Sequence, residues 1–448
     1  MSKIQPLSGF PEWLPEQELV QQQFLSTIRR LFELYGYTPL HTRAVEPLDV
    51  LLAKGETDKE IYVLRRLQAE AADEGEAELG LHFDLTVPFA RFVAQNRGLL
   101  SFPFRRYQIQ PVWRGERPQL GRYREFIQAD IDVIGEGELE VRYDGEVVRV
   151  LHEVTEALPI PPVRLQVNNR KVLEGFYRGL GITDIVTTLR ALDKLAKIGP
   201  DGVTDQLSSR GYTAAQIEGC LAIAGIEGAI GPVTEAVRAL GVSHPLLDEG
   251  LDELAEVMAA CAGAREGAVV AALHIARGLD YYTGTVVEGV FTDMPGAGSV
   301  CSGGRYDNLA SMGSKQKLPG VGVSIGVSRM LGLLFEAGRL ATTRRSPAQV
   351  WVIVHRDDER AEAEAVATAL RTRGIPALVS TRAAGYGKQI KWADRLGIPY
   401  AWFPAKGDKA HEVKVLSTGA QEPASPDTWT PDPALTALRL LGATQGSS

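Results

Sequence analysis

The chain has few cysteines and no long apolar run, and both absences exclude classes of protein. Its 448 residues include three cysteines, widely separated at Cys220, Cys261 and Cys301. This spacing argues against a disulfide scaffold or a zinc site and is typical of a reducing compartment. No stretch approaches the roughly 20 apolar residues needed to span a bilayer, and Met1 to Gly9 lack the apolar segment of a signal peptide. We therefore expect a cytoplasmic protein that does not enter a membrane.

The chain also lacks an excess of positive charge. Its 48 basic and 56 acidic residues give a formal net charge of −8. This balance excludes the global cationic field that non-specific nucleic-acid binding uses, so any such surface must be local. An apolar fraction of 44% and a charged fraction of 23% are typical of a globular protein, and the length predicts more than one domain.

The hydrophobic pattern predicts a sheet that is interrupted by helices. An amphipathic helix is expected over 17–35 and a second one over 84–96. The predicted strands of this part of the chain are 37–42, 61–64, 79–83, 107–113, 126–134, 269–275, 285–291, 299–302 and 321–325. Short helices dominate from 190 to 262, and 66–80 reads as an acidic loop. The sheet therefore continues after a helical insertion, and a helix over 328–336 follows it.

After residue 347 the pattern changes to a regular alternation of strands and helices. Strands are expected at 350–354, 375–380 and 400–403, with helices at 359–373 and 387–396 between them. A βαβαβ order of this kind predicts a small domain with a parallel sheet. The domains predicted from the whole pattern are 1–189, an insertion at 190–262, a continuation at 263–341, and the small αβ domain at 347–437.

Two familiar phosphate-binding motifs are also missing, because neither GxxxxGK[ST] nor GxGxxG occurs between a strand and a helix. Any nucleotide would have to be held by arginines instead. The segment from Arg114 to Phe126 contains four arginines around a Pro and a Gly, which suits a loop between two strands. Guanidinium groups match phosphate oxygens in geometry and charge. The alternative is a solvated hairpin tip, which a second arginine cluster makes less attractive.

That second cluster runs from Arg277 to Tyr282 directly after an apolar strand pattern. It would place Arg277 at the rim of the sheet beside the hydroxyls of Tyr281 and Tyr282. A surface ion pair between Arg277 and Asp280 is an equally simple explanation. Two glycine-bearing segments, 303–307 and 320–329, would let the backbone approach a ligand, although each alone is also compatible with a β-bulge.

Together these segments resemble a known family. The strand, loop and strand around Arg114 resemble motif 2 of class II aminoacyl-tRNA synthetases, and 320–329 resembles motif 3. The segments 277–282 and 303–307 resemble two motifs peculiar to histidyl-tRNA synthetases. The resemblance covers nearly the whole chain, and 385–396 is similar to the basic helix of the family's anticodon-binding domain. It implies an α+β fold with an antiparallel-sheet catalytic core, a helical insertion and a small C-terminal α/β anticodon-binding domain.

The resemblance also implies an activity. The chain is expected to be an ATP-dependent aminoacyl-tRNA ligase that joins L-histidine and ATP into histidyl-adenylate and diphosphate. It would then transfer histidine to the 3′ end of tRNA(His). ATP is expected as a substrate, with Mg²⁺ held mainly by its phosphates and no metal held by the protein itself. A homodimer is the expected assembly.

The family's roles carry over residue by residue. Arg114 and Arg277 are the implied catalytic residues: Arg114 would hold the ATP α-phosphate and the histidine carboxylate, and Arg277 would stabilise charge on that phosphate. The residues implied in histidine binding are Asp84, Thr86, Arg114, Gln128, Asp132, Arg277, Tyr281 and Tyr282. Asp132 and Tyr282 would each form a hydrogen bond with one of the two imidazole nitrogens. The residues implied in ATP binding are Arg114, Arg122, Arg277 and Arg329. Arg117 and Gln119 would face the acceptor end of the tRNA.

The sequence departs from the family pattern in two places. Arg43 stands where motif 1 is expected to end with a proline at the dimer interface. Asp84 and Asp132 stand where many bacterial members have glutamate, which looks like the eukaryotic type of the family. A shorter acid reduces the reach of the side chain by one methylene, so the backbone of the pocket must compensate.

Three rival functions have to be weighed. A synthetase-like regulatory subunit of ATP phosphoribosyltransferase would lack the anticodon domain, which residues 347–430 resemble. A module that senses uncharged tRNA would be expected to have lost its phosphate-binding arginines. A class II ligase for a different small acid is disfavoured by the Tyr281-Tyr282 pair and by Asp132.

Overall fold

The computed structural model describes residues 5–52, 60–66, 78–276, 281–307, 316–342 and 344–436. Contacts divide the chain into two compact units, one containing Phe24–Leu333 and the other Leu334–Ser448 with Glu12–Gln23. The predicted motif residues 277–280 and most of the predicted acidic loop lie outside the described residues. Within the described residues, no helix is long and apolar enough to cross a membrane.

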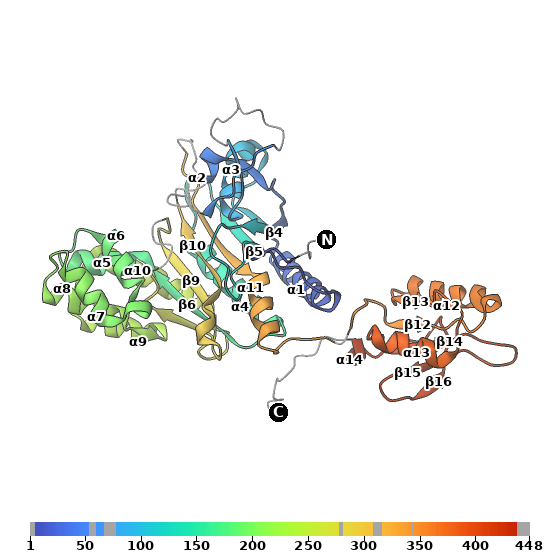
Figure 1. The fold of residues 1–448 in the computed structure, drawn as a ribbon. Coiled ribbons are helices and arrows are strands. Elements are labelled where there is room, and N and C mark those ends of the chain that lie inside the picture. Colours follow the sequence, from blue (N-terminus) through green and yellow to red (C-terminus); the bar gives the residue numbers. More distant parts are fainter. Residues whose placement is uncertain are drawn as a thin grey trace. The chain divides into compact units, whose positions relative to one another are not determined.

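The larger unit is built on one mixed sheet of nine strands (Figure 1). In spatial order these are β1 (Thr38–Pro39), β4 (Phe104–Trp113), β5 (Glu125–Ile134), β11 (Gly320–Gly326), β10 (Ser299–Tyr306), β9 (Thr285–Phe291), β6 (Val163–Asn169), β8 (Val269–Ala272) and β7 (Glu227–Gly228). The pairs from β4 to β6 are all antiparallel, whereas β1 pairs with β4, and β6 with β8, in parallel. The predicted α+β fold with an antiparallel core is thus confirmed.

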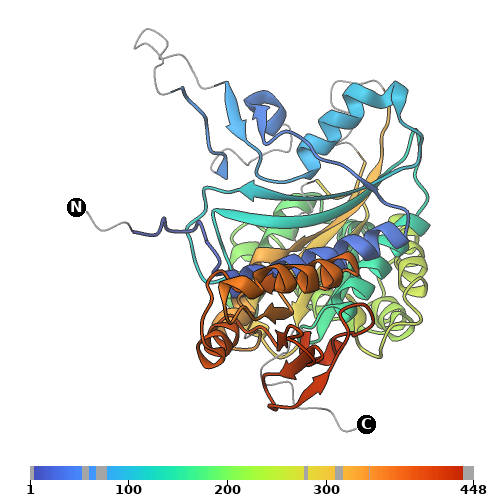
Figure 2. The same ribbon diagram turned by 90° about the vertical axis from the view of Figure 1, so that its right-hand side faces the viewer.

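The long strands β4 and β5 lie side by side over ten residue pairs (Figure 2). Both are rich in β-branched and aromatic side chains, which favour extended pairing. A second, two-stranded sheet pairs β2 (Val45–Pro47) with β3 (Leu79–Leu81). The sheet residues Ala129, Ile131 and Val133 of β5 are buried on one face. The side chains between them therefore lie on the opposite face, which carries the site described below.

Helices alternate with these strands along the chain. They are α1 (Pro15–Leu34), α2 (Leu48–Leu52), α3 (Thr86–Asn96), α4 (Arg142–Ala157) and α11 (Val327–Glu336), with short 3₁₀ turns at Arg97–Leu99 and Pro295–Ala297. Helix α4 packs against β5, β11 and β6. It carries a buried face of Val147, Val148, Val150, Leu151 and Val154. This helix covers the apolar face of the sheet and leaves the polar face open.

A cluster of helices lies at the end of the sheet formed by β6, β8 and β7 (Figure 1). It comprises α5 (Arg170–Gly179), α6 (Ile185–Leu192), α7 (Leu195–Ser208), α8 (Ala214–Ala224), α9 (Ile230–Ala239) and α10 (Pro245–Ala259). Helices α5 and α10 can approach closely because glycines lie where they meet. A Cβ at Gly175 would overlap the Leu247 backbone, and a Cβ at Gly250 would overlap the Val172 backbone. The short helices predicted after residue 190 are therefore present. The predicted domain boundaries stay predictions.

The second unit has a five-stranded sheet in the order β13 (Ala377–Val379), β12 (Val350–Val352), β14 (Tyr400–Phe403), β15 (Glu412–Val415) and β16 (Gln421–Pro423). Its helices are α12 (Arg360–Thr372), α13 (Tyr386–Arg395) and α14 (Pro433–Thr436), with a 3₁₀ turn at Asp357–Glu359. The predicted parallel sheet is correct for β13, β12 and β14. It is incomplete, because β15 and β16 add an antiparallel edge that short, polar sequences did not reveal.

Two strand predictions in the larger unit were too generous. The run 37–42 forms only the two-residue strand β1, and 61–64 forms only one bridge, between Val63 and Gly80. Val63 and Leu64 are largely exposed, so their apolar side chains are not part of a buried strand face. Conversely, no element was predicted over α4, β6 and α5, although β6 is a strand of the sheet and both helices contact it.

Candidate active site

The open face of the sheet carries polar side chains from three neighbouring strands. On β5, Gln128, Asp130 and Asp132 alternate with buried apolar residues and so share this face. Asp132 is paired in register with Arg106 of β4 and Gly322 of β11. Asp130 is paired with Gln108 and Ser324, and Gln128 with Gln110 and Gly326. The sheet register therefore creates a row of buried polar groups, which is unusual for a sheet interior.

A cavity of about 80 Å³ lies on this row. Its lining includes seven residues that the sequence predicted to bind histidine, namely Asp84, Thr86, Arg114, Gln128, Asp132, Tyr281 and Tyr282. The structure thus brings these side chains together from four separate parts of the chain. Asp130, Ser302, Tyr306 and Ser324 also line it, and none of them was assigned a role from the sequence.

The Asp132 carboxylate is held from two sides. Its Oδ2 lies 2.7 Å from Nη2 of Arg106, and the Tyr306 hydroxyl donates to its Oδ1 at 2.5 Å. Arg106 is fully buried, with its guanidinium carbon 4.4 Å from the centroid of the Phe89 ring. Gly322 permits this arrangement, because a Cβ there would overlap the Asp132 carboxylate. Because Asp132 is paired with the buried cation of Arg106, its carboxylate has a fixed position in the cavity.

Asp130 differs from Asp132 although it lies only two residues away on the same face. Burial raises the pKa of Asp130 to about 7, with the charge of Arg106 lowering it and that of Asp132 raising it. Its Oδ1 is buried and has no hydrogen-bond partner among the described residues. The signal for this residue was present in the sequence, since strand alternation places it between Gln128 and Asp132.

The other walls of the cavity come from α3 and from the segment before β9. Asp84 is buried at the start of α3, where its Oδ1 accepts a hydrogen bond from the Val87 backbone N–H at 3.0 Å. The rings of Tyr281 and Tyr282 lie with their centroids 4.1 Å apart. Burial raises the pKa of Tyr281, so its hydroxyl stays protonated and can serve as a hydrogen-bond donor.

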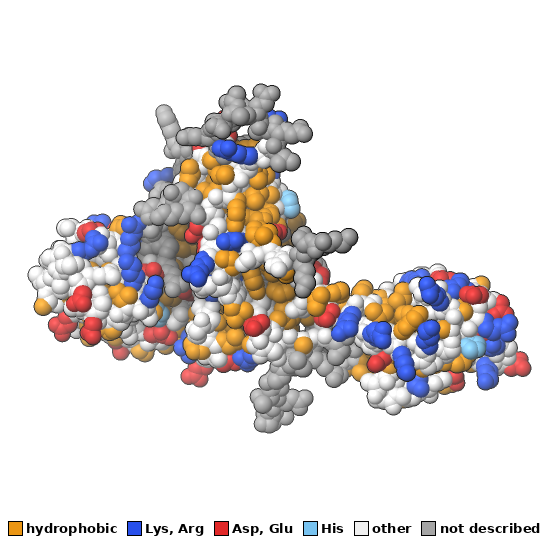
Figure 3. Space-filling model, viewed as in Figure 1, with side chains coloured by type: hydrophobic (Ala, Val, Ile, Leu, Met, Phe, Trp, Pro, Cys, Tyr) orange, Lys and Arg blue, Asp and Glu red, His pale blue; other side chains and the backbone are white. Residues whose placement is uncertain are grey.

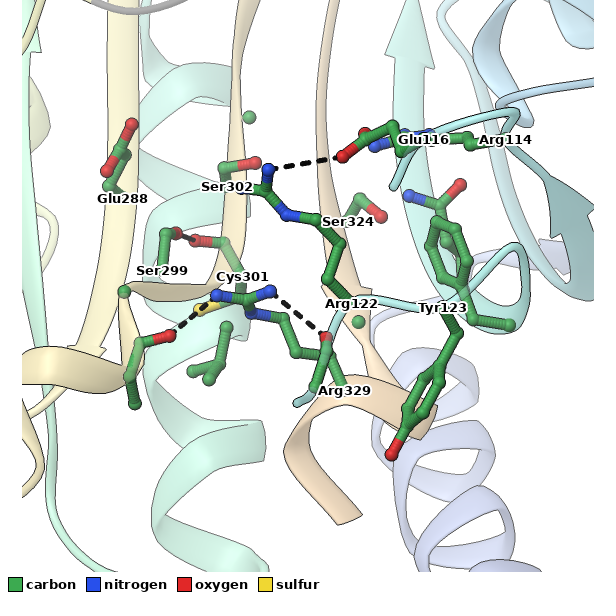
Figure 4. Close-up of a pocket in the computed structure, with 18 of the residues that line it drawn as sticks. Arg114, Glu116, Arg122, Tyr123, Glu288, Ser299, Cys301, Ser302, Ser324 and Arg329 are labelled. Carbon is green, nitrogen blue, oxygen red and sulfur yellow. Dashed lines mark hydrogen bonds and ion pairs between the residues drawn. The ribbon is translucent and has the colours of Figure 1, made fainter. Parts of the chain in front are cut away.

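A larger cavity of about 530 Å³ adjoins the small one (Figure 4). The two share seven lining residues, namely Arg114, Gln128, Tyr281, Tyr282, Ser302, Gly303 and Ser324. Arg122 and Arg329, both predicted to bind ATP, line the larger one, and so does Gln119, which was predicted to face the tRNA acceptor end. A cavity of this size lies in the range of small-molecule sites.

The arginines of the larger cavity are held mainly by backbone carbonyls. Arg114 donates from Nε to the Phe83 carbonyl at 3.0 Å. Arg329 donates to the carbonyls of Gly121 at 3.0 Å and Ala297 at 2.6 Å (Figure 4). Arg122 is half exposed and its Nη1 lies 3.3 Å from an oxygen of Glu116. Carbonyls orient a guanidinium without neutralising it, so Arg114 keeps its charge available for phosphate oxygens.

The acidic groups at the larger cavity are few. Glu116 and Glu288 line it, and the described residues contain no cluster of three or more potential metal ligands. The expectation that the protein itself holds no metal stays a prediction.

Among the described residues of the predicted motifs, the arginines Arg117, Arg124 and Arg305 line neither cavity. Arg117 lies on the exposed loop between β4 and β5 and lines neither cavity. Arg305 is tied to Asp144 of α4, with Nη2 2.7 Å from Oδ1, so it stabilises the covered face of the sheet and does not reach a ligand. Arg277 lies outside the described residues.

Comparisons with known proteins agree with this geometry. The sequence model of the family described as "Histidyl-tRNA synthetase" matches residues 9–330, and that described as "Anticodon binding domain" matches residues 349–425. The histidine–tRNA ligase of Thermobifida fusca is 53% identical over 95% of this chain and 97% of its own length. That of Micrococcus luteus is 51% identical over 96% of this chain and 97% of its own length.

The similarity extends to a solved structure. The crystal structure of histidyl-tRNA synthetase from Nostoc sp. PCC 7120 is 34% identical and has a TM-score of 0.86. The match covers 95% of this chain and 98% of the Nostoc chain. With identities near one half over almost the full length, and with the predicted site residues gathered around two adjoining cavities, the chain belongs to the histidyl-tRNA synthetase family.

Proposed function

We infer that this chain is a histidine–tRNA ligase, which activates L-histidine with ATP and transfers it to the 3′ end of tRNA(His). The observation that carries the inference is the pair of adjoining cavities, one lined by buried acids and tyrosines, the other by arginines. They meet at Arg114, which lines both. A side chain at this junction can contact an amino-acid carboxylate and a phosphate together.

The proposed first step is an in-line attack of the histidine carboxylate on the α-phosphorus of ATP, with diphosphate leaving. Both reactants are anions, so catalysis requires their positioning and the neutralisation of like charges, and no general base. We assign this work to Arg114 and Arg277. Arg122 and Arg329 hold the nucleotide, and Mg²⁺ accompanies its phosphates.

The proposed histidine site is the small cavity. Asp84 and Thr86 hold the α-amino group, and Gln128 lies at the carboxylate side. Asp132 and Tyr282 address the imidazole nitrogens, with Tyr281 beside them. Such polar partners reject apolar amino acids of similar size, because a substrate without ring nitrogens leaves the buried groups unpaired.

The proposed tRNA contacts lie in both units. Arg117 and Gln119, exposed on the loop between β4 and β5, are assigned to the acceptor end. In the second unit, α13 presents the exposed basic side chains Lys388, Lys391 and Arg395. Figure 3 shows Lys and Arg side chains on the face of this unit turned to the viewer. A local basic surface of this kind suits a phosphate backbone despite the net charge of −8.

A homodimer, acting in the cytoplasm where proteins are made, remains our proposal.

Arg43, which stands in the place of the motif 1 proline, lies 2.8 Å from Glu46. The other carboxylate oxygen of Glu46 lies 2.6 Å from Arg91. Because Glu46 is fully buried, these ion pairs hold the segment from Arg43 to Glu46 in place. A proline at position 43 would instead restrict the backbone directly.

Charging of tRNA tests the proposed function. With ATP, histidine and tRNA(His), labelled histidine should become acid-precipitable as an ester of the tRNA. A variant with Lys388, Lys391 and Arg395 changed to alanine should charge tRNA poorly while it still forms histidyl-adenylate. Formation of the adenylate by the wild type without any charging would contradict the second half of the reaction.

A further inference from the structure

Two buried carboxyl groups lie on one face of β5, and one of them is already provided for. Asp132 is bound by Arg106 and by the Tyr306 hydroxyl, whereas Oδ1 of Asp130 has no hydrogen-bond partner among the described residues. Successive residues of a strand rise about 3.3 Å, so the two side chains start roughly 7 Å apart. An imidazole ring spans such a gap.

The surroundings of Asp130 come from several elements. The charged and titratable groups that face it or line the same cavity are Arg106 of β4, Asp132 of β5, Asp84 at the start of α3, Arg114, Tyr281, Tyr282 and Tyr306. Its neutral neighbours in register are Gln108 and Ser324. Arg106 lies 2.7 Å from Asp132, so its charge is largely matched before Asp130 is considered. Two ionised carboxylates this close to one buried cation are unfavourable, and one of them tends to keep a proton.

We propose that Asp130 is a specificity-determining residue of the histidine pocket, which holds one proton and shares it with the imidazole of the substrate. Neutral imidazole has one N–H donor and one nitrogen lone pair. The Asp132 carboxylate accepts from the N–H, and the protonated Asp130 carboxyl donates to the lone pair in place of the Tyr282 hydroxyl. Moving that proton onto the ring gives imidazolium between two carboxylates, so both descriptions contain the same number of protons.

The consequence is a pH dependence that belongs in part to the protein. Below about pH 6.5 free histidine carries a ring proton, and the complex would have one proton too many. Above the pKa of Asp130, which burial raises to about 7, the complex would have one too few. The value of kcat/KM for histidine should therefore fall on both sides of neutrality, and the alkaline decline should report Asp130.

The decisive variant is Asp130→Asn, because an amide presents a donor at every pH. This inference rests on the proposed function, so histidine-dependent exchange of diphosphate into ATP is measured first on the wild type. In Asp130→Asn the alkaline decline of kcat/KM that begins near pH 7 should disappear, while the acid decline remains. The α-amino group of histidine titrates equally in both proteins, so their difference reports Asp130. As a matched control, Asp205→Asn at an exposed position of α7 should keep both declines.

The outcomes separate the two claims. Wild-type protein without any histidine-dependent exchange would overturn the proposed function. Exchange with an alkaline decline that is unchanged in Asp130→Asn would overturn the role of Asp130 alone. If Asp130→Asn does not fold, a histidine analogue with a triazole ring, which is far less basic, decides the question on the wild type. Its acid decline should vanish while the alkaline one stays, and loss of the alkaline decline as well would overturn the proposal.

Discussion

The two cavities of the larger unit treat charge in opposite ways. In the small cavity the charges are buried and bound to one another, as in Arg106 with Asp132, whose side chains are 0% and 3% exposed. In the larger cavity the arginines are fixed by carbonyls or, like Arg122, are 51% exposed. In the buried small cavity, Coulomb interactions are strong and change greatly when a single proton is gained or lost. In the exposed larger cavity, they are weak and depend less on any one charge.

This difference matches two tasks. A pocket that selects one amino acid profits from buried groups whose hydrogen bonds must all be satisfied, because a wrong side chain leaves them unpaired. A nucleotide with several phosphates needs cations that remain free to follow it. Arg114 lies at the junction of both cavities and is the residue whose loss should affect both tasks.

The largest effect is expected for Arg114→Ala. This change removes a cation from the place where carboxylate and phosphate meet, so kcat/KM for both histidine and ATP should fall by about 10³-fold in diphosphate exchange. Arg114→Lys keeps the charge but not the paired N–H groups and should recover only part of the loss. A loss confined to one of the two substrates would break the assignment of Arg114 to both cavities.

A large effect on stability is expected for Arg106→Met. Asp132 would then be a buried charge without its partner, which typically costs about 3–5 kcal/mol of unfolding free energy. Denaturant titration should show a much lower midpoint. The exposed pair offers the matched comparison, because Arg122→Met should change the unfolding free energy by less than about 1 kcal/mol. Equal effects of the two changes would contradict the contrast drawn between the cavities.

A smaller, pH-dependent effect on stability is expected for Asp130→Asn. Burial raises the pKa of Asp130 above its unfolded value, so the native state keeps the proton that the unfolded state loses. The unfolding free energy of the wild type should therefore decrease as pH rises from about 4 to about 7. The variant lacks this decrease, and its advantage in melting temperature should grow over that interval. A difference that stays constant with pH would show that Asp130 is ionised in the native protein.

The smallest effect is expected for Tyr306→Phe. It removes one hydrogen bond to the Asp132 carboxylate, worth about 1.5–3 kcal/mol, and leaves the ion pair with Arg106 in place. The KM for histidine should rise several-fold, with the KM for ATP unchanged. Tyr123→Phe, at the larger cavity, provides the comparison and should leave the KM for histidine unaltered. A change in the KM for ATP caused by Tyr306→Phe would contradict the assignment of histidine and ATP to separate cavities.

Much of the site could be predicted from the sequence because its residues occur in dense local motifs. Gln128 and Asp132 lie on the long strand β5, and Arg114 directly follows the long strand β4, so their positions followed once these strands were recognised. Asp130 was overlooked although the same alternation places it on their face. The motif arginine Arg305 reads like a ligand-binding residue, but strand alternation turns it toward Asp144 on the covered face.

Other features depend on distant contacts that local patterns do not reveal. The partnership of Arg106, Asp132 and Tyr306 joins strands β4, β5 and β10, and Tyr306 lies 174 positions after Asp132 in the chain. The antiparallel edge β15 and β16 is short and polar, so its sequence resembles that of a loop. Helix α4 and strand β6 have ordinary sequence patterns. Their roles, α4 as the cover of the sheet and β6 as one of its strands, are apparent only from the fold.

The most direct test of the account is amino-acid-dependent exchange of labelled diphosphate into ATP by the purified chain without tRNA. The account predicts exchange with L-histidine and none above background with the other standard amino acids. Exchange with a different amino acid would contradict the assignment of the small cavity to histidine. An absence of exchange with every amino acid would contradict the claim that the two cavities form an adenylation site.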